Sequence, residues 1–540
     1  MRTAIEQVRS GVREHLSSPP NVALWVLLIA VAAGFRLWGI TWGFPRADLN
    51  PDESLVLRTA MKMTWADPNP HFYNYCGFIF HVSFLSSEFL KAFGMELDEI
   101  GRLLVHRLWT VLWGTLTVPV VFVLARQVGG SVRGAFIAGA LLAITPLHVW
   151  ESHFGTTDAP LLLFMTSSLA VSIGAAEQPT WRRAILAGLL TGFATGTKYP
   201  GAFGVVPFAA AIAIALYDRR LATWKDAVRL VAVFGAGAVA GSFMVSPYQY
   251  LDGIQTINTF LFELDNVETG HFGFDLNVPG WQYRPYLYEF VAAFPFGFGV
   301  ALALLVYVSV AWFAWRPSRP RLVALAFVAV FFGITGSWLF VPVRYFMPLF
   351  PVFLVAAGLF LDTLLIRRQW LGIAVTAIVL GYTTAFTATT THRLTYDTRN
   401  ESGEWIERHV PPGSVLLLAH SILRSYSPLP DPERVPSRLV RLGRLDRTVE
   451  EYQKDMAGSP TGAKVYISAS GLEYLRYYRT REPESVAAWD HLRQNPSRYR
   501  LVKVFERWYL NKSFYSSLDP MYASYFVAPR IEIYEAISDQ

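Results

Sequence analysis

Long apolar runs dominate the first 390 residues of the chain. Runs of roughly 17–25 apolar residues are long enough to cross the hydrocarbon core of a bilayer as helices. The run at 184–198 is short, and Pro200 separates it from the next one, so these two form either two crossings or a re-entrant pair. The pattern predicts eleven runs, at 22–40, 101–126, 133–149, 160–176, 184–198, 200–217, 227–247, 286–314, 322–341, 344–363 and 369–389.

Two longer segments, 41–100 and 247–285, lie between apolar runs. The first contains an amphipathic stretch at 72–93, where polar residues such as His81, Glu88 and Lys91 interrupt the apolar ones. A helix with this many polar positions is expected to lie along the membrane interface instead of crossing it. The second segment is rich in aromatic residues and glycine.

Residues 390–540 follow a different pattern. Apolar runs shorten to the length of strands, and helical patterns stand between them, as expected for a small α/β domain. A stretch rich in Tyr and Arg, Tyr474–Arg479, is either a solvated helix face or a contact for sugars or lipid headgroups. The predicted strands are Val415–Ala419, Lys464–Ser468, Leu501–Phe505 and Ile531–Tyr534, with helices at Glu401–His409 and Val449–Met456.

Basic residues are distributed unevenly over the gaps between the apolar runs. Alternate gaps hold most of them, whereas the other short gaps hold only Lys198, Arg284 and Arg344. Because cytoplasmic loops carry the excess of Lys and Arg, the N-terminus is expected in the cytoplasm, and eleven crossings put the C-terminus outside. The basic gaps contain Arg2, Arg9, Arg13, Arg126, Arg133, Arg182, Arg183, Arg219, Arg220, Lys225, Arg316, Arg319, Arg321, Arg367 and Arg368.

The composition supports a membrane protein. Of 540 residues, 53% are hydrophobic and only 16% are charged, against about 25% in soluble proteins. Cys76 is the only cysteine, so an intramolecular disulfide is excluded. The net charge of +6 follows from membrane orientation, and nucleic acid is not an expected partner. The predicted fold class is a polytopic α-helical membrane protein with a small C-terminal extracytoplasmic α/β domain.

These observations divide the chain into three parts. Residues 1–20 form the cytoplasmic N-terminus, 21–390 the transmembrane domain with its first outer loop at 41–100, and 391–540 the extracytoplasmic domain. No cleavage site for a signal peptidase follows the first apolar run, which we interpret as a retained helix. The expected location is the inner, or cell, membrane.

The first outer loop opens with Asn50-Pro51-Asp52-Glu53. Adjacent carboxylates repel each other, which suits a general base or a metal ligand. The alternative is structural: Asp52 or Glu53 occupies the first turn of a helix that begins near Pro51, where the helix dipole favours negative charge.

A second polar segment, His153 to Pro160, is expected on the same outer face. Asp158 is its acidic residue, and Thr157 or Asp158 could instead cap the following helix. Glu151 and His153 add titratable groups nearby. Two acidic segments on one face could converge on one cavity.

Two cations lie where helices meet the outer interface. Lys198 follows Gly196-Thr197, and Arg344 precedes Tyr345-Phe346. Either can hold a lipid-linked phosphate or extend to lipid headgroups; Arg36 is a weaker candidate. The signatures of P-loop ATPases, dinucleotide-binding folds and zinc proteases are absent from the sequence.

Taken together, the order of these motifs resembles the GT-C glycosyltransferases, specifically the protein O-mannosyltransferase and aminoarabinose transferase type. The resemblance covers roughly residues 20–390. The first loop departs from the family pattern, because it reads Asn69-Pro70-His71-Phe72-Tyr73 where relatives often have His or Lys before two prolines. The motifs that carry the resemblance are Pro51-Asp52-Glu53, Thr157-Asp158-Ala159-Pro160, Gly192–Tyr199 and Arg344–Pro351.

The resemblance implies transfer of a sugar from a polyprenyl-phosphate donor to a protein, lipid or glycan acceptor, with inversion at the anomeric carbon. Asp52 would be the base with Glu53 beside it, and Asp158 would orient the acceptor or bind a metal. Lys198 and Arg344 would bind the donor phosphate. His71, Glu151 and His153 are candidate contacts of the acceptor or sugar.

Several alternatives stay open at this stage. The same cations would suit a transporter or flippase of lipid-linked sugars, and a non-catalytic assembly scaffold would not need the acidic pair. Within the enzyme class, an oligosaccharyltransferase or a ligase of long glycans would also fit. No cofactor is certain, and Asp52, Glu53 and Asp158 are the candidate ligands for a divalent metal.

Overall fold

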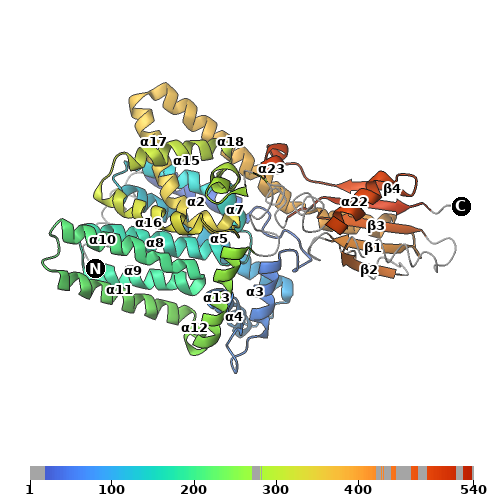
Figure 1. Cartoon of the computed structure of the whole chain (residues 1–540), viewed down its shortest axis with the longest axis horizontal. Coiled ribbons are helices and arrows are strands. Elements are labelled where there is room, and N and C mark those ends of the chain that lie inside the picture. Colours follow the sequence, from blue (N-terminus) through green and yellow to red (C-terminus); the bar gives the residue numbers. More distant parts are fainter. Residues whose placement is uncertain are drawn as a thin grey trace. The chain divides into compact units, whose positions relative to one another are not determined.

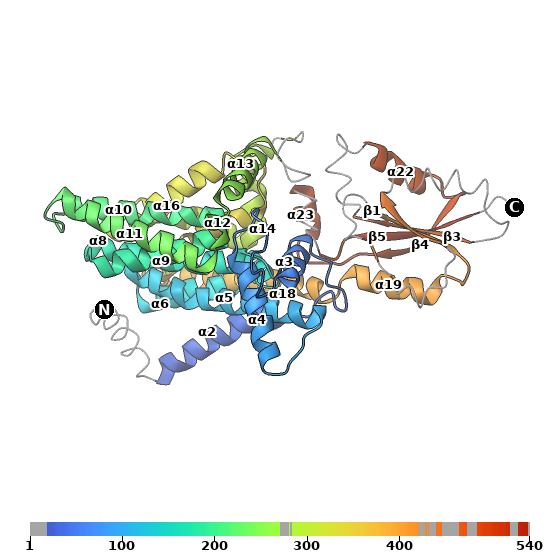
Figure 2. The same cartoon turned by 90° about the horizontal axis from the view of Figure 1, so that it is seen from below.

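The computed structural model describes residues 19–270, 280, 283–420, 427–428, 430, 439–444, 464–471, 483–518 and 527–537. The predicted helix Val449–Met456 and the stretch Tyr474–Arg479 lie outside these residues. The described chain forms two compact units, whose elements are labelled in Figures 1 and 2. The first unit comprises residues 1–40, 55–277 and 283–388, and the second comprises 41–54, 278–282 and 389–540.

The first unit is helical. Each of the eleven predicted apolar runs coincides for most of its length with helix. The helices that match them are α2 (Pro19–Leu37), α5 (Glu99–Gln127), α6 (Val132–Ala143), α7 (Pro146–Glu151), α8 (Asp158–Glu177), α9 (Trp181–Thr197), η1 (Tyr199–Gly204), α10 (Val205–Tyr217), α11 (Trp224–Val245), η3 (Glu289–Ala293), α14 (Phe294–Phe298), α15 (Val300–Ala314), α16 (Arg319–Thr335), η4 (Val343–Leu349), α17 (Phe350–Arg367) and α18 (Gln369–Thr395).

The predicted number of eleven membrane crossings is not confirmed. Within the described residues, six helices are long and apolar enough to cross a membrane, or seven if one bent pair counts as a single span. Other runs form shorter helices: α6 has 12 residues, and α9 and α16 have 17 each. The six spans are Glu99–Gln127, Asp158–Glu177, Tyr199–Tyr217, Trp224–Val245, Val343–Arg367 and Gln369–His409.

The bent pair interrupts the predicted run at 286–314. Its two halves, Glu289–Phe298 and Val300–Ala314, meet at 118°. Gly299 lies at the break with φ +78°, a conformation that glycine adopts at little cost because it has no Cβ. A run that looks continuous in hydropathy is therefore two helices in the structure.

Small residues allow α9 and α11 to pack closely. A Cβ at Gly188 would lie 2.2 Å from the carbonyl oxygen of Phe234, and one at Gly192 would lie 2.2 Å from that of Ala238. Such glycine contacts are a common way for membrane helices to associate. In both views α8, α9, α10 and α11 lie side by side (Figures 1 and 2).

The first outer loop carries two helices, α3 (Pro51–Lys62) and α4 (Phe78–Ala92). The predicted amphipathic stretch is thus helical over its C-terminal part. Ile79, Phe80 and Phe84 of α4 are buried against the bundle, while Leu85 and Phe89 are exposed.

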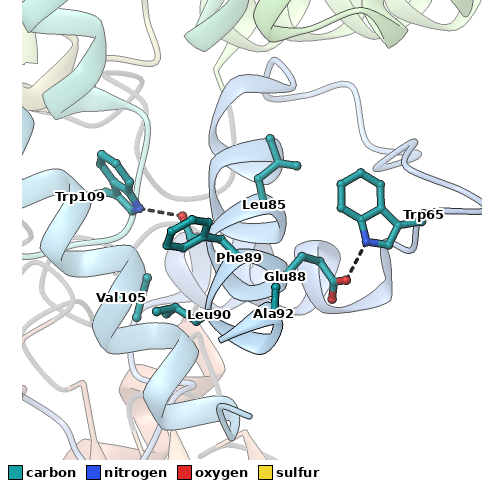
Figure 3. A pocket seen from close by; sticks show the side chains of 9 residues that line it. Trp65, Leu85, Glu88, Phe89, Leu90, Ala92, Val105 and Trp109 are labelled. Carbon is teal, nitrogen blue, oxygen red and sulfur yellow. Dashed lines mark hydrogen bonds between the residues drawn. The ribbon is translucent and has the colours of Figure 1, made fainter. Parts of the chain in front are cut away.

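An apolar groove of about 770 Å³ lies between α4, α5 and Trp65 (Figure 3). The polar groups along it are paired with one another: Trp65 Nε1 donates to Glu88 at 2.7 Å, and Trp109 Nε1 donates to Ser86 Oγ at 2.8 Å. Apart from these paired groups, the side chains that line the groove are apolar.

The second long segment between apolar runs, 247–285, begins with α12 (Tyr248–Leu251) and α13 (Gly253–Thr269). The second unit contains α19 (Thr398–His409), α22 (Pro483–Gln494) and α23 (Lys512–Leu518), with a sheet of five strands in the order β2-β1-β3-β5-β4. Strands β1, β2 and β3 are parallel, and β5 pairs antiparallel with β3 and β4. The strands are β1 (Val415–His420), β2 (Leu439–Arg444), β3 (Val465–Ser470), β4 (Tyr499–Phe505) and β5 (Ile531–Ala536).

Helices α22 and α19 lie on opposite faces of this sheet (Figure 2), and each contributes to an apolar cluster. One contains Ile406 and Val410 of α19, and the other contains Trp489 and Leu492 of α22. The four predicted strands are confirmed, and β2 was not predicted because Arg441, Gly443 and Arg444 break its apolar pattern.

Candidate active site

The acidic pair lies in the first turn of α3. Asn50 caps this helix, because its Oδ1 accepts hydrogen bonds from the main-chain nitrogens of Asp52 at 3.0 Å and Glu53 at 3.1 Å. Pro51 occupies the first helical position, which suits its fixed φ. The capping alternative is thus present in the structure. It does not compete with a chemical role, since the helix dipole also stabilises negative charge at Asp52.

Asp158, Lys198 and Arg344 form a buried cluster in the first unit. Lys198 Nζ lies 2.9 Å from Asp158 Oδ1, and Arg344 Nε lies 3.7 Å from Asp158 Oδ2. The exposed fractions of the three side chains are only 11%, 4% and 13% for Lys198, Asp158 and Arg344. Three residues that are far apart in the sequence therefore share one site.

Element ends build this cluster. Asp158 begins α8 after a buried turn, Lys198 caps the C-terminal end of α9 with extended backbone, and Arg344 lies in η4. The ring of Tyr345, next to Arg344, lies 4.6 Å from Lys198 Nζ and adds a cation–π contact. Sequence reasoning missed this role of Tyr345, although its position beside Arg344 was a usable signal.

Among the described residues, two cations lie at the one carboxylate of this cluster. Arg344 is too far from Asp158 for a hydrogen bond at 3.7 Å. Removing charges from water is costly unless they are compensated. A guanidinium and an ammonium held this close together are groups that can bind an anion such as a phosphate.

The other candidate contacts have different surroundings. His153 is buried, and its ring nitrogens lie 2.8 Å from the carbonyl oxygen of Val149 and 2.9 Å from that of Trp38. Burial lowers the pKa of His153 to about 4. Glu151 is buried in α7.

Arg36, the weaker cation candidate, is fully buried in α2. Its guanidinium donates to the carbonyl oxygens of Ala32 and Ala143 and lies 2.7 Å from His148 Nδ1. These contacts favour a structural role over contact with lipid headgroups.

A polar cluster joins the first outer loop to the second, and the sequence did not predict it. Asp252 Oδ2 accepts hydrogen bonds from Asn69 Nδ2 at 2.6 Å and from the Tyr73 hydroxyl. These hydrogen bonds hold the pKa of Asp252 below its ordinary value. His71, two residues from Asn69, is exposed and lies 2.9 Å from Asp67 through Nε2.

A metal does not fit well at Asp158, because Lys198 already provides a positive charge at its carboxylate. Among the described residues, no three His, Cys, Asp or Glu side chains gather into a metal-binding group. The metal roles predicted for Asp52 and Glu53 stay predictions.

The family comparison matches part of this chain. Residues 71–251 match the family described as dolichyl-phosphate-mannose-protein mannosyltransferase. The matched region includes Asp158 and Lys198 and ends before Arg344. Among curated proteins, none matches the chain by sequence.

Solved structures have a similar fold. ArnT from Cupriavidus metallidurans in the apo state is 18% identical with a TM-score of 0.50, over 85% of this chain and 95% of that one. The predicted resemblance to the fold of GT-C glycosyltransferases is confirmed. The Archaeoglobus fulgidus oligosaccharyltransferase tethered with an acceptor peptide is 13% identical, with a TM-score of 0.50, over 95% of this chain and 88% of that one. The buried cluster of Asp158, Lys198 and Arg344 thus lies at the ends of helices within a GT-C fold.

Proposed function

We propose that the chain is a membrane glycosyltransferase that moves a sugar from a polyprenyl-phosphate carrier to an acceptor on the extracytoplasmic face. The observation that carries this proposal is the buried cluster of Asp158, Lys198 and Arg344, in which two cations from different elements lie close together. Two of its three residues lie in the region that matches a family acting on dolichyl-phosphate-mannose. That donor is itself a sugar on a polyprenyl phosphate.

Lys198 and Arg344 bind the donor phosphate in this proposal. A guanidinium and an ammonium in a buried site form strong, charge-assisted hydrogen bonds to phosphate oxygens. Asp158 orients Lys198 through the 2.9 Å ion pair. Because negative charge grows on the leaving phosphate during transfer, both cations stabilise the transition state more than the ground state.

Asp52 is the general base, with Glu53 beside it. It accepts the proton of an acceptor hydroxyl or amine while that atom attacks the anomeric carbon from the face opposite the phosphate. The bond between the anomeric carbon and the phosphate oxygen breaks, and the polyprenyl phosphate leaves with the bonding electrons. The configuration of the sugar is therefore inverted.

The proposed location follows from the distribution of basic residues. The N-terminus lies in the cytoplasm, and the second unit lies outside an inner or cell membrane. Protein, lipid and glycan acceptors all present suitable hydroxyl or amine groups. The groove beside α4 faces membrane lipids in this arrangement.

A transfer assay tests the proposal. Purified chain receives radiolabelled polyprenyl-phosphate sugars and a membrane extract, with and without EDTA, beside Asp52→Asn. Asp226→Asn is the matched control, because Asp226 is also a first-turn carboxylate, in the capping box of α11. We expect labelled product from the native chain and from Asp226→Asn, and at least a hundredfold loss with Asp52→Asn.

Two results would change the proposed mechanism. Full transfer by Asp52→Asn would remove the base, and EDTA sensitivity would add a metal to the mechanism. If no donor is consumed while labelled lipid crosses liposome membranes in both variants, the chain is a transporter of lipid-linked sugars instead.

A further inference from the structure

The segment at 41–54 is held by residues about 350 positions later in the chain. Arg399 Nη1 donates to the carbonyl oxygen of Leu49 at 2.9 Å, and Asn400 Nδ2 donates to that of Phe44 at 3.1 Å. Arg46 Nη1 donates in turn to the carbonyl oxygen of Ser427 at 3.1 Å. Residues 41–54 accordingly belong to the same compact unit as residues 389–540.

Arg399 is itself fixed by Asp397. Its Nε and Nη2 donate to the two carboxylate oxygens of Asp397 at 2.8 and 2.7 Å, and neither side chain is exposed. Asp397 also accepts hydrogen bonds from the main-chain nitrogens of Arg399 at 2.9 Å and Ala528 at 3.0 Å. The planar guanidinium thus has one orientation, with Nη1 directed at Leu49.

Leu49 leads directly into the capped start of α3. Its carbonyl belongs to the planar peptide group between Leu49 and Asn50. Fixing this oxygen therefore fixes the orientation of the peptide group that leads into the capping residue Asn50. Leu49 and Asn50 are both buried. Gly43 has φ +79°, and a Cβ there would lie 2.7 Å from Leu49 Cδ1. A side chain at position 43 would therefore clash with Leu49.

We propose that Arg399 is a positioning residue for the base of the proposed reaction. With Asp397, it fixes the Leu49 carbonyl, and thereby the direction in which Asn50 starts α3 and presents Asp52. Through this contact, the C-terminal residues 389–540 take part in the proposed transfer. A buried ion pair adds little net stability compared with apolar residues of similar size, so its value here lies in geometry.

This inference rests on the proposed function, and Arg399→Lys tests it. Lysine keeps the charge, but its single nitrogen cannot occupy the three positions from which Nε, Nη1 and Nη2 contact Asp397 and the Leu49 carbonyl. We expect kcat to fall ten- to a hundredfold, since small displacements of a reacting group have effects of this size. The KM for the donor should stay within twofold, because Lys198 and Arg344 are unchanged.

Arg408→Lys is the matched control on the same helix. Arg408 pairs with Glu404 at 3.0 Å, but the two side chains are 71% and 62% exposed. This variant should keep kcat and KM within twofold of the native values. Asn400→Ala, which removes only the contact to Phe44, should lower kcat less than Arg399→Lys does.

A second readout does not depend on activity. The main-chain amides of Asp52 and Glu53 are protected by Asn50, so their hydrogen exchange reports the order of this turn. Arg399→Lys should speed exchange over residues 44–54 at least tenfold, while α22 and the sheet keep native rates. Arg408→Lys should change neither region.

The outcomes separate this inference from the proposed function. Native exchange over 44–54, or native kcat, in a folded Arg399→Lys chain would overturn the positioning role. A rise in donor KM with unchanged kcat would overturn it as well. Full transfer by Asp52→Asn would instead show that Asp52 is not the base of the proposed reaction. Faster exchange in Arg399→Lys would still show in that case that Arg399 orders residues 44–54.

Discussion

At the scale of residues, Lys198 has two partners that a surface lysine would lack. It pairs with Asp158 and lies against the ring of Tyr345. Its burial means that these contacts are less screened by water than those of exposed pairs. The same contacts limit the directions in which the ammonium can move, so that the phosphate of the proposed donor would find it already placed.

Lys198→Met removes the ammonium and keeps most of the side-chain volume. We expect kcat/KM for the donor to fall at least a hundredfold, because one of two cations for the phosphate is lost. The free energy of unfolding should also fall by about 3–5 kcal/mol, since Asp158 loses its nearest cation in a buried site. Transfer kinetics and urea titration check the two effects, with the exposed Lys225→Met as control. Native kinetics in Lys198→Met would remove this residue from the donor site.

Glu532 in β5 gives a prediction of pH dependence. It is buried and accepts hydrogen bonds from Trp489 Nε1 at 3.2 Å and Arg530 Nη2 at 2.7 Å, and one from the Tyr534 hydroxyl. Burial by itself raises the pKa of Glu532, but these hydrogen bonds and the charge of Arg530 outweigh it and lower the pKa below the ordinary value.

A lowered pKa in the folded state means that this contribution is present above the ordinary pKa of Glu and is lost as the pH falls through the folded value. Glu532→Gln should therefore lower the free energy of unfolding by about 2 kcal/mol at pH 7. The difference between variant and native chain should shrink below about pH 4. Denaturation followed at several pH values measures it, and a difference that grows on acidification would contradict the assignment.

At the scale of elements, glycines set the distance between α9 and α11. Gly192→Ala would bring a Cβ to 2.2 Å from a main-chain oxygen, which a side-chain rotation cannot relieve. We expect a loss of about 1–3 kcal/mol in stability from this overpacking. Gly235→Ala on α11 is the control, because nothing lies within 4 Å of its added Cβ. Gly235→Ala should leave the free energy of unfolding unchanged or raise it by up to about 1 kcal/mol through helix propensity. Equal melting temperatures for the two variants would disprove the close contact between α9 and α11.

Hydropathy predicted the positions of most elements, because burial in lipid or in a core requires long apolar stretches. It did not predict the 118° bend at Gly299, since the apolar character continues through the break. Strand β2 was missed because its Arg441 and Arg444 resemble a polar loop. In the site, acidic and basic residues at helix ends were recognisable, whereas the approach of Asp158, Lys198 and Arg344 depends on how α8, α9 and η4 pack. Arg399 gave no signal, because its partner Leu49 is 350 positions away.

At the scale of the whole molecule, the number of crossings decides on which side of the membrane the proposed chemistry takes place. Seven or eleven crossings put the chain ends on opposite sides, whereas six put them on the same side. The distribution of basic residues predicts opposite sides, with the sheet outside. Only in that arrangement does the C-terminal unit share a compartment with a donor presented from the outer leaflet.

Thiol labelling in intact cells measures this topology. Cys76 is buried, so the native chain should give little background. Cysteine introduced at the exposed Ser513 of α23 should react with an impermeant maleimide in intact cells, while Lys225→Cys should react only after permeabilisation. Labelling of both sites only after permeabilisation would mean an even number of crossings between residues 225 and 513. The C-terminal unit would then lie in the cytoplasm, and Arg399 could not order a base that acts on the outer face.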